Sequence, residues 1–468
     1  MKKTLLAILL FIFLQPIVAQ ENSMQLSLEE AINYALENSY NTKVARNDIE
    51  AANKKVWETT ATGLPQINGK VEYQNFLKQP VSLLPAAAFD NTSSTINTVE
   101  EYFNLQANKP AVAPEGFIPV VFGTKQNINA SVTLSQLLFD GSYLVGLQAS
   151  KTYLKISEQA KQKTEILTKE AVINAYGNVL VTEKSITILE ENIKILQKNF
   201  NDAKKIFENG FNEEEDVEQL EITLSTVKNE LNNIKRMKEI AYQMLNLSLG
   251  TNIKTTLILT DSLDSLIDNN ISLELISENL DVENHIDFKI SENERESKRL
   301  MLKLEKSKAL PSISAFVNYG SQAFSDSFTL FNNNQQWFQQ SLLGVSLNVP
   351  IFSSFVRKAK TAQAKIALES ADLRLEETKQ RLSLLAEKAK SEYQFSIENY
   401  LTAKKNVTLA KRIEKKQRIK FFEGISSSFD LLQAQNQLYT QQQNYIQSML
   451  GVIANKAALE NALNTSIK

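Results

Sequence analysis

The sequence predicts a mainly α-helical protein with a smaller β portion, in which two internal repeats follow one plan. Three observations lead to this prediction: long apolar stripes at helical spacing, four short alternating runs, and two matching turns. The turns read FENGFNEEED over residues 207–216 and FFEGISSSFD over residues 421–430. In each turn a Phe, a Gly and an Asp stand in the same order and at the same spacing. Each turn interrupts a long helical pattern that then resumes, which predicts two helical hairpins.

The composition argues against several classes of protein. The 468 residues carry a net charge of only −2, whereas a protein that binds a nucleic-acid backbone favours a basic surface. The absence of cysteine excludes disulfides, thiol nucleophiles and cysteine-bound zinc. His285 is the single histidine, which argues against a histidine metal centre or a Ser-His-Asp triad. We therefore expect neither an enzyme nor a cofactor.

The first residues predict a secretory signal peptide over 1–19. Two lysines precede an apolar run from Leu5 to Leu14, and small residues follow at Val18 and Ala19. The alternative is a membrane anchor, but this run is shorter than the roughly 20 residues of a spanning helix. No later segment is long and apolar enough either, so a membrane-embedded form of the mature chain would have to be a barrel.

The two halves of the chain carry the same landmarks in order. LPQINGKVEY at 64–73 corresponds to LPSISAFVNY at 310–319, and VTLSQLLFDGS at 132–142 corresponds to VSLNVPIFSSF at 345–355. Each half predicts a helix, a Leu-Pro pair that ends it, a strand, a loop, a second strand, a long helix, a glycine turn and a final helix. The predicted boundaries are a first repeat at 20–249, a connecting segment at 250–285 and a second repeat at 286–468.

Four runs alternate with period two and predict strands at about 64–76, 126–139, 310–320 and 341–352. In the first run Ile67, Val71 and Tyr73 alternate with Asn68 and Glu72. Roughly ten residues is the length of a transmembrane strand. Aromatic residues gather at both ends of the runs, as in lipid-facing barrels: Phe139 and Phe352, and opposite them Phe76, Phe324, Trp337 and Phe338.

Four strands cannot close a barrel, since small barrels need about eight. The strands therefore belong either to a soluble sheet or to an oligomer, in which three chains would supply twelve. The first loop, at 77–125, is long and is expected to be irregular and to lie on the outer face, whereas the second, at 321–339, is short.

The long helices are predicted from heptad stripes. Each inbound helix covers about 65 residues, or roughly 100 Å, and is stable only if its stripe meets another helix. The stripes are Val179, Thr182, Ile186, Leu189, Ile193, Leu196, Phe200, Ala203 and Phe207; Val217, Leu220, Leu224, Val227, Leu231 and Ile234; Ala359, Ala362 and Ile366; Tyr400, Ala403, Val407 and Ala410; and Leu438, Tyr445, Val452 and Leu459.

The glycines and aspartates of the turns have a predicted role. Gly210 and Gly424 can adopt the left-handed backbone that ends a helix, and Asp216 and Asp430 can cap the free N–H groups of the next helix. These residues are either caps alone or also part of a gate or docking surface, and both roles can hold together.

The chain resembles the TolC-like outer membrane efflux proteins over essentially all of its mature length. The resemblance rests on the leading segment at 26–56, on LPQI and LPSI, on LLFDGS, and on FEGISSSFDLLQAQNQL at 422–438. It implies a homotrimer in the outer membrane of a Gram-negative bacterium, with a twelve-stranded transmembrane β-barrel and a long periplasmic α-barrel. It also implies a passive exit duct for efflux or type I secretion, whose partners are outer membrane lipid, a periplasmic adaptor and an inner membrane pump of RND or ABC type. The alternative is a secreted or periplasmic coiled-coil scaffold.

The resemblance also marks possible gate residues at the tips. Ser426 and Gln433 stand where well-known members carry an arginine and an aspartate of the closed tip, while Asp216 keeps the aspartate of the first turn and Phe421 is the aromatic residue before the second turn. A different lock is a hypothesis from the charges: Glu213, Glu214 and Glu215 at the first turn would pair with Lys416 and Arg418 before the second. The alternative is that both groups form solvated faces.

Overall fold

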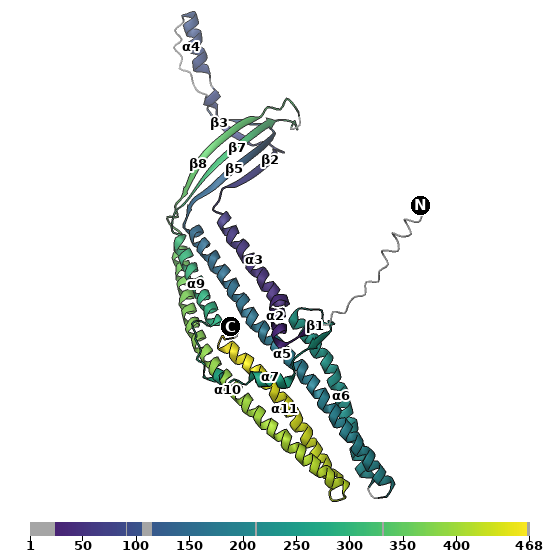
Figure 1. Ribbon diagram of the computed structural model, residues 1–468. Coiled ribbons are helices and arrows are strands. Elements are labelled where there is room, and N and C mark those ends of the chain that lie inside the picture. The colour runs from purple at the N-terminus through teal and green to yellow at the C-terminus, as the bar shows by residue number, and fades with distance from the viewer. Residues whose placement is uncertain (1–23, 90, 105–114, 211–212, 330–331, 466–468) are drawn as a thin grey trace, which may run out of the picture. The chain divides into compact units, whose positions relative to one another are not determined.

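A computed structural model describes residues 24–89, 91–104, 115–210, 213–329 and 332–465 (Figure 1). The predicted signal peptide lies outside the described residues. The chain divides into two compact units: a helical unit within 24–56, 148–302 and 362–465, and a strand unit at 57–147 and 303–361. Four helices, α3, α5, α9 and α10, each cross the boundary between the units.

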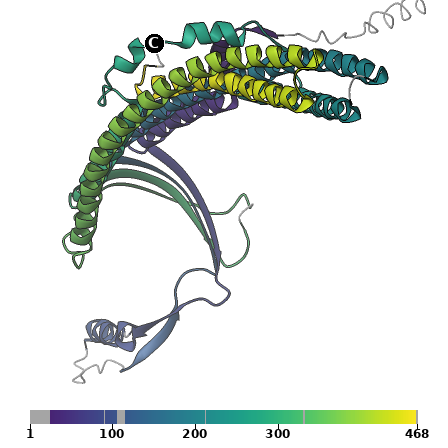
Figure 2. The same cartoon turned by 90° about the horizontal axis from the view of Figure 1, so that it is seen from below.

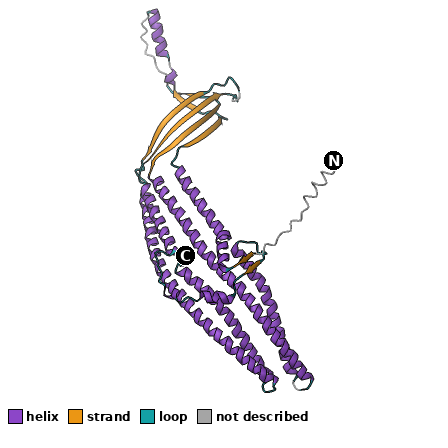
Figure 3. Cartoon of the chain, viewed as in Figure 1, coloured by secondary structure: helices purple, strands orange, loops and turns teal. Residues whose placement is uncertain are grey.

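Helices and strands follow the predicted order and are coloured by type in Figure 3. The helices are α2 (Leu28–Asn38), α3 (Tyr40–Ala61), α4 (Thr92–Phe103), α5 (Gly141–Glu208), α6 (Glu214–Leu249), α7 (Leu263–Asn270), α8 (Glu274–Ser277), α9 (Ile286–Ser307), α10 (Val356–Phe422) and α11 (Ser428–Ala462), with a 3-10 turn η1 (Ala86–Phe89). The strands are β1 (Met24–Leu26), β2 (Gln66–Asn75), β3 (Val81–Pro85), β4 (Phe117–Val121), β5 (Gln126–Asp140), β6 (Leu257–Leu259), β7 (Ser312–Ser325) and β8 (Phe338–Asn348). The inbound helices α5 and α10 have 68 and 67 residues, which confirms the predicted length.

The helical unit consists of two antiparallel hairpins, α5–α6 and α10–α11, which lie side by side with both turns at the same end (Figures 1 and 2). Its main core lies at the other end of the hairpins, where β1 pairs in parallel with β6 and α7 lies against α11. The buried Tyr176 of α5 organises this region: its hydroxyl donates to the carbonyl oxygen of Leu26 at 3.0 Å and lies 3.1 Å from Asp261. Asp261 in turn accepts from the backbone N–H of Leu28 at 2.7 Å.

The strand unit contains a four-stranded antiparallel sheet in the order β2-β5-β7-β8. The registers align one apolar row across all four strands, consisting of Ile67, Leu134, Val317 and Leu343. All four side chains of this row are exposed. On the opposite face Asn318 donates to Thr133 at 2.7 Å, which links β7 to β5. Among the described strands, β2 and β8 pair on one side only, which leaves two long open edges.

Three expectations for the strands need correction. The third strand runs to Ser325 rather than to about 320 and the fourth begins at Phe338, so the loop between them covers 326–337 rather than 321–339. The fourth strand ends at Asn348 rather than at 352, because Pro350 cannot donate to the ladder, and Phe352 lies beyond the strand. The loop at 77–125 is not irregular throughout, since β3 and β4 form a two-stranded ribbon and α4 lies between them in the chain. Residues 90 and 105–114 of this loop lie outside the described residues.

The predicted stripes are buried along much of the hairpins but not everywhere. Leu196, Leu224, Val407 and Leu438 are buried as expected. The start of the α10 stripe is not buried within the single chain, where Ile366 is 61% exposed.

Across the described residues, we find no helix that combines the length and the apolar character needed to cross a membrane.

Candidate functional site

The first hairpin tip joins α5 to α6. Gly210 adopts a left-handed backbone with φ of 79° and donates to the carbonyl oxygen of Phe207 at 2.7 Å, as in helix C-terminal motifs. The N-cap of α6 is Glu213, whose side chain makes no capping hydrogen bond to the described residues. Asp216 is the third residue of α6, as Asp430 is of α11, but its carboxylate makes no capping hydrogen bond to the described residues, so the predicted capping role is not seen. Asp216 does lie in the first turn with Glu214 and Glu215, where carboxylates favour the positive helix end, as predicted. Residues 211 and 212 of this tip lie outside the described residues.

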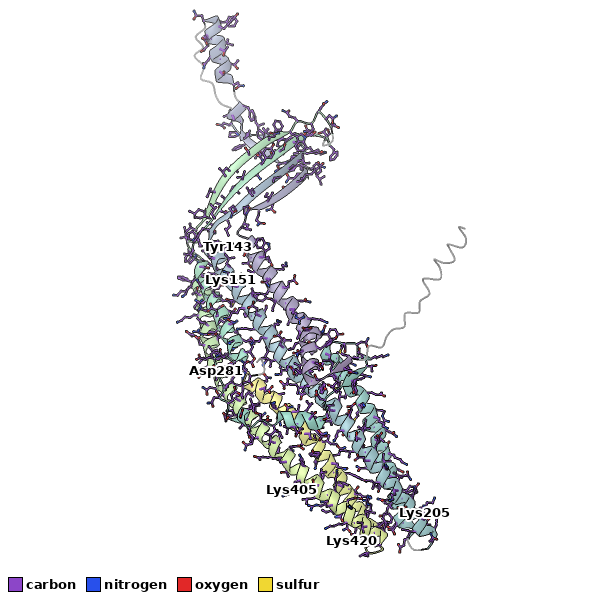
Figure 4. All side chains as sticks on the ribbon, in the orientation of Figure 1. Tyr143, Lys151, Lys205, Asp281, Lys405 and Lys420 are labelled. Carbon is purple, nitrogen blue, oxygen red and sulfur yellow. The ribbon has the colours of Figure 1, made fainter. Side chains whose placement is uncertain are left out.

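The second tip joins α10 to α11 and is closed by a complete Schellman motif. Gly424, with φ of 74°, donates to the carbonyl oxygen of Phe421 at 3.0 Å. The next N–H, that of Ile425, donates to the carbonyl oxygen of Lys420 at 2.9 Å. Lys205 and Lys420 occupy the last turns of α5 and α10, where a cation favours the negative helix end (Figure 4).

A capping box starts the helix after the second tip. The hydroxyl of Ser427 accepts from the backbone N–H of Asp430 at 3.2 Å, and the carboxylate of Asp430 accepts from the backbone N–H of Ser427 at 3.3 Å. The predicted cap at Asp430 is thus confirmed. The hydroxyls of Ser427 and then Ser426 hold the pKa of Asp430 below its ordinary value, because both donate to the carboxylate. Ser426 is therefore part of the cap network.

The two tips pack against each other within one chain. Phe421 is buried with Ala203, Leu220 and Leu431 between the hairpins. Its ring meets that of Phe422 edge to face, with centroids 5.2 Å apart. The structure thus places Phe421, predicted as a possible gate residue, in a core between the two hairpins of the protomer.

A polar contact also joins the tips. The hydroxyl of Ser428, at the start of α11, donates to the side-chain oxygen of Gln219 in α6 at 3.1 Å. Each hairpin end is therefore fixed to the other by apolar packing and by a hydrogen bond.

The acidic residues of the first tip do not pair with the basic residues before the second turn in the described part of the chain. Among the described residues, Glu213, Glu214 and Glu215 are exposed and form no ion pair with the basic residues before the second turn. Lys416 and Gln433 are also exposed. The structure therefore does not bring these predicted gate residues together in one protomer, and a lock between copies stays a prediction.

Arg418 has a partner on its own helix, Glu414, at 3.6 Å. Glu414 is buried, and burial raises the pKa of its carboxyl, which Arg418 partly counteracts. Arg418 is accordingly committed to a buried acid rather than to the first tip.

A feature that the sequence reasoning missed is a set of amides at heptad spacing between α5 and α11. Asn192 donates to Gln442 at 2.8 Å, and both are buried. One heptad nearer the tip, Asn199 and Gln435 are also buried, but the amide nitrogen of Asn199 and both polar atoms of Gln435 find no partner among the described residues. The signal was available, because the residues are seven apart on each helix.

A groove of about 570 Å³ lies between α5 and α10 near the tips. Basic residues (Lys194, Lys198 and Arg418), acidic residues (Asp202 and Glu423) and apolar residues (Ile195, Ile419 and Phe422) line it together with Asn199. It therefore combines charges of both signs with apolar side chains.

No group of His, Cys, Asp or Glu side chains in the described part of the chain is arranged to hold a metal ion. Among the described residues of the tips, no acid, base and nucleophile come together. The tips offer an acidic first turn of α6 beside the packed end of the second hairpin.

Comparison with known proteins gives the class. The chain matches the sequence profile of the outer membrane efflux protein family over residues 121–251 and 279–465, and it belongs to that family. Membership assigns it to efflux transport at the outer membrane rather than to a family of enzymes, and it favours a channel over the coiled-coil scaffold. No curated protein matches the chain by sequence.

Solved structures share the fold. The chain is similar to CusC, with a TM-score of 0.70 and 18% identity over 93% of this chain and 92% of CusC. It is similar to the outer membrane protein VceC of Vibrio cholerae, with a TM-score of 0.67 and 14% identity over 93% of this chain and 95% of VceC. It is also similar to the open state of the MtrE outer membrane channel of Neisseria gonorrhoeae, with a TM-score of 0.65 and 17% identity over 93% of this chain and 88% of MtrE.

Proposed function

We propose that three copies of this chain form a passive exit duct of the outer membrane, which opens toward the periplasm at the hairpin tips. The observation that carries the proposal is the open sheet. Its edges, β2 and β8, present unpaired backbone groups over about ten residues each, and a sheet of four strands is too small to close on itself. Three sheets joined edge to edge give a barrel of twelve strands.

The faces of the sheet suit such a barrel. The aligned apolar row of Ile67, Leu134, Val317 and Leu343 would face lipid, and the face of Asn318 and Thr133 would line the pore. An aromatic contact on the apolar face supports an interfacial belt at one end, where the rings of Tyr73 and Phe328 lie 5.8 Å apart.

The helical hairpins also carry surfaces that a neighbouring copy would cover. On α6, exposed apolar residues recur at steps of three and four: Met237, Ile240, Met244 and Leu247. On α10, Ile366 and Leu373 are exposed and seven residues apart. In the proposed trimer these stripes meet between chains, so that the hairpins form the wall of a periplasmic tunnel.

The match to one family profile in two segments, each with a long helix, a glycine turn and a return helix, supports the two-repeat plan at 20–249 and 286–468, with 250–285 as the connection. We further propose that the groove between α5 and α10, with its charged rim and the apolar Ile419 and Phe422, receives a helical end of a periplasmic adaptor. The adaptor would connect the duct to an inner membrane pump of RND or ABC type, which would supply the energy.

The tips are the proposed gate. Glu213, Glu214 and Glu215 of one copy would pair with Lys416 and Lys420 of the next and hold the tunnel narrow. Exposed pairs contribute only about 0–1 kcal/mol each, so the lock depends on several pairs acting together.

Planar-bilayer recording tests the duct and the lock separately. The wild-type protein is expected to give stable single-channel currents, and the triple substitution Glu213→Lys, Glu214→Lys, Glu215→Lys is expected to raise the conductance. Glu376→Lys with Glu377→Lys, exposed acids away from the tips, is the matched control and should leave it unchanged. An unchanged conductance in the triple variant would remove the lock, whereas a wild-type protein without any channel activity would contradict the duct.

A further inference from the structure

The insertion at 77–125, between β2 and β5, forms a separate feature of the strand unit. Its ribbon, β3 and β4, continues these two strands: the N–H of Phe76 donates to the carbonyl oxygen of Lys125 at 2.8 Å, and Gln79 donates to that of Gly123 at 3.2 Å. Both views show the ribbon and α4 projecting from the end of the four-stranded sheet (Figures 1 and 2). The ribbon therefore stands at the far end of the sheet from the start of α5.

One face of the ribbon is apolar and is exposed among the described residues. Directly opposite residues of an antiparallel pair share a face, so Val81 lies with Val121, Leu83 with Pro119, and Pro85 with Phe117. All six are exposed, including Leu83 at 65% and Phe117 at 68%. The other face carries Ser82, the half-buried Leu84 and Val120, and Ile118, which is 40% exposed.

An apolar ribbon of this kind is not stable by itself, because two-stranded sheets are marginal in water without a further packing layer. Neither strand pairs with a third strand among the described residues, and Pro119 in β4 is a residue that blocks strand addition at an edge. Another protein surface must therefore cover the ribbon by packing on its apolar face rather than by adding a strand to its edge. Neither strand contains a charged residue, so identical faces can approach one another without repulsion.

We propose that the apolar faces of the ribbons from the three copies pack against one another around the shared axis and cover the outer end of the pore. This proposal rests on the trimer proposed above. The ribbon extends β2, an open edge strand through which that trimer would join, so three ribbons stand at one rim of the barrel. Tethering at one rim gives the faces an effective concentration of roughly millimolar for each other, which favours their contact.

Cysteine cross-linking tests the contact, because the chain has no cysteine of its own. Leu83→Cys places a thiol on the apolar face, and Ser82→Cys places one on the opposite face as the matched control. Phe117→Cys repeats the test on β4 in case Leu83→Cys folds poorly. Oxidation of the membrane-embedded protein is expected to link most Leu83→Cys or Phe117→Cys chains into dimers, with several-fold less linkage for Ser82→Cys.

The outcomes separate this proposal from the trimer. Native mass spectrometry that finds three copies, with no more linkage at Leu83 than at Ser82, would overturn the ribbon contact and leave the duct intact. A fluorophore on Leu83→Cys that brominated lipids quench would place the face in the bilayer and would also overturn it. A single copy in detergent would refute the trimer itself, and the ribbon contact with it.

Discussion

The two hairpin tips of this chain have the same order of Phe, Gly and Asp but are held in different ways. The second tip is closed by a Schellman motif, a capping box between Ser427 and Asp430, and the buried ring of Phe421. The first tip has the glycine turn, but the side chain of its N-cap, Glu213, makes no capping bond, and Phe207 is 37% exposed. Three acidic residues occupy the first turn after it.

This difference shows that equal spacing in the sequence does not mean equal anchoring. The second tip is fixed by its own residues, whereas the first is fixed mainly where the second packs on it. In the proposed gate, the carboxylates of the first tip are the groups available to a neighbouring copy. The second tip holds the first in place by packing against it.

The largest expected effect separates the two aromatic residues. Phe421→Ala removes a buried ring and leaves a cavity, so we expect it to lower the free energy of local opening at the tips by about 3–5 kcal/mol. Phe207→Ala, at the equivalent position of the first tip, should cost much less because its ring is partly in water. Amide hydrogen exchange in the adjoining turns of α6 and α11 measures both. Equal losses of protection would show that the tips are anchored alike.

The next prediction compares the two buried amide pairs between α5 and α11. Gln442→Leu leaves the buried Asn192 without its acceptor and should destabilise the contact between α5 and α11 by about 1–3 kcal/mol. Gln435→Leu removes two polar atoms that have no partner among the described residues, so it should be neutral or stabilising. Hydrogen exchange in α11 reports both variants. A Gln435→Leu variant that loses as much protection as Gln442→Leu would contradict the distinction.

The sequence predicted the regular parts of the fold because their periodicity is strong. Period-two alternation located β2, β5 and β7, and the heptads located α5 and α10. It missed the ribbon at 77–125, because VSLLP and FIPVV are short, contain proline and do not alternate cleanly with polar residues. It also extended the fourth strand past Pro350.

The candidate site was predicted less completely. Glycine spacing located both tips, since Gly210 and Gly424 adopt the expected left-handed backbone. Asp216 and Asp430 occupy equivalent helical positions, but only the second forms a capping box, because Ser427 is its N-cap whereas Glu213 is the N-cap of the first tip. Asn199 and Gln435 were missed because the heptad stripes were identified from apolar residues alone. Contacts between chains cannot be predicted from the periodicity of a single chain.

A smaller effect concerns the caps. Ser427→Ala removes the hydroxyl that accepts from the N–H of Asp430 and should destabilise the start of α11 by about 1 kcal/mol. Glu213→Ala at the first tip is the matched change and should have almost no effect on the start of α6, because no side-chain cap is lost there. Exchange rates in the first turn of each helix test this prediction, and a comparable loss in both would refute it.

The smallest expected effect is a dependence on pH at the cap of the second tip. The pKa of Asp430 is lowered by the hydroxyls of Ser427 and Ser426, so the folded state holds the proton less tightly than the unfolded chain. The contribution of this cap is therefore complete above the ordinary aspartate pKa of about 3.9 and is lost as the pH falls through the lower folded value.

A nitroxide attached at Ile425→Cys, an exposed site beside Gly424, should become more mobile in that acidic range. With Asp430→Asn the nitroxide should be mobile at neutral pH already and should respond little to acid. If nitroxide mobility changed with pH in the same way with and without Asp430→Asn, the cap would not be the cause of the pH dependence.

The central claim is that open sheets of separate copies complete one pore wall, and the mass of the intact protein tests it most directly. Native mass spectrometry of the protein extracted from membranes in detergent should find three chains per particle, and removal of detergent should make the sample aggregate. A particle with one chain that stays dispersed in water without detergent would contradict the claim.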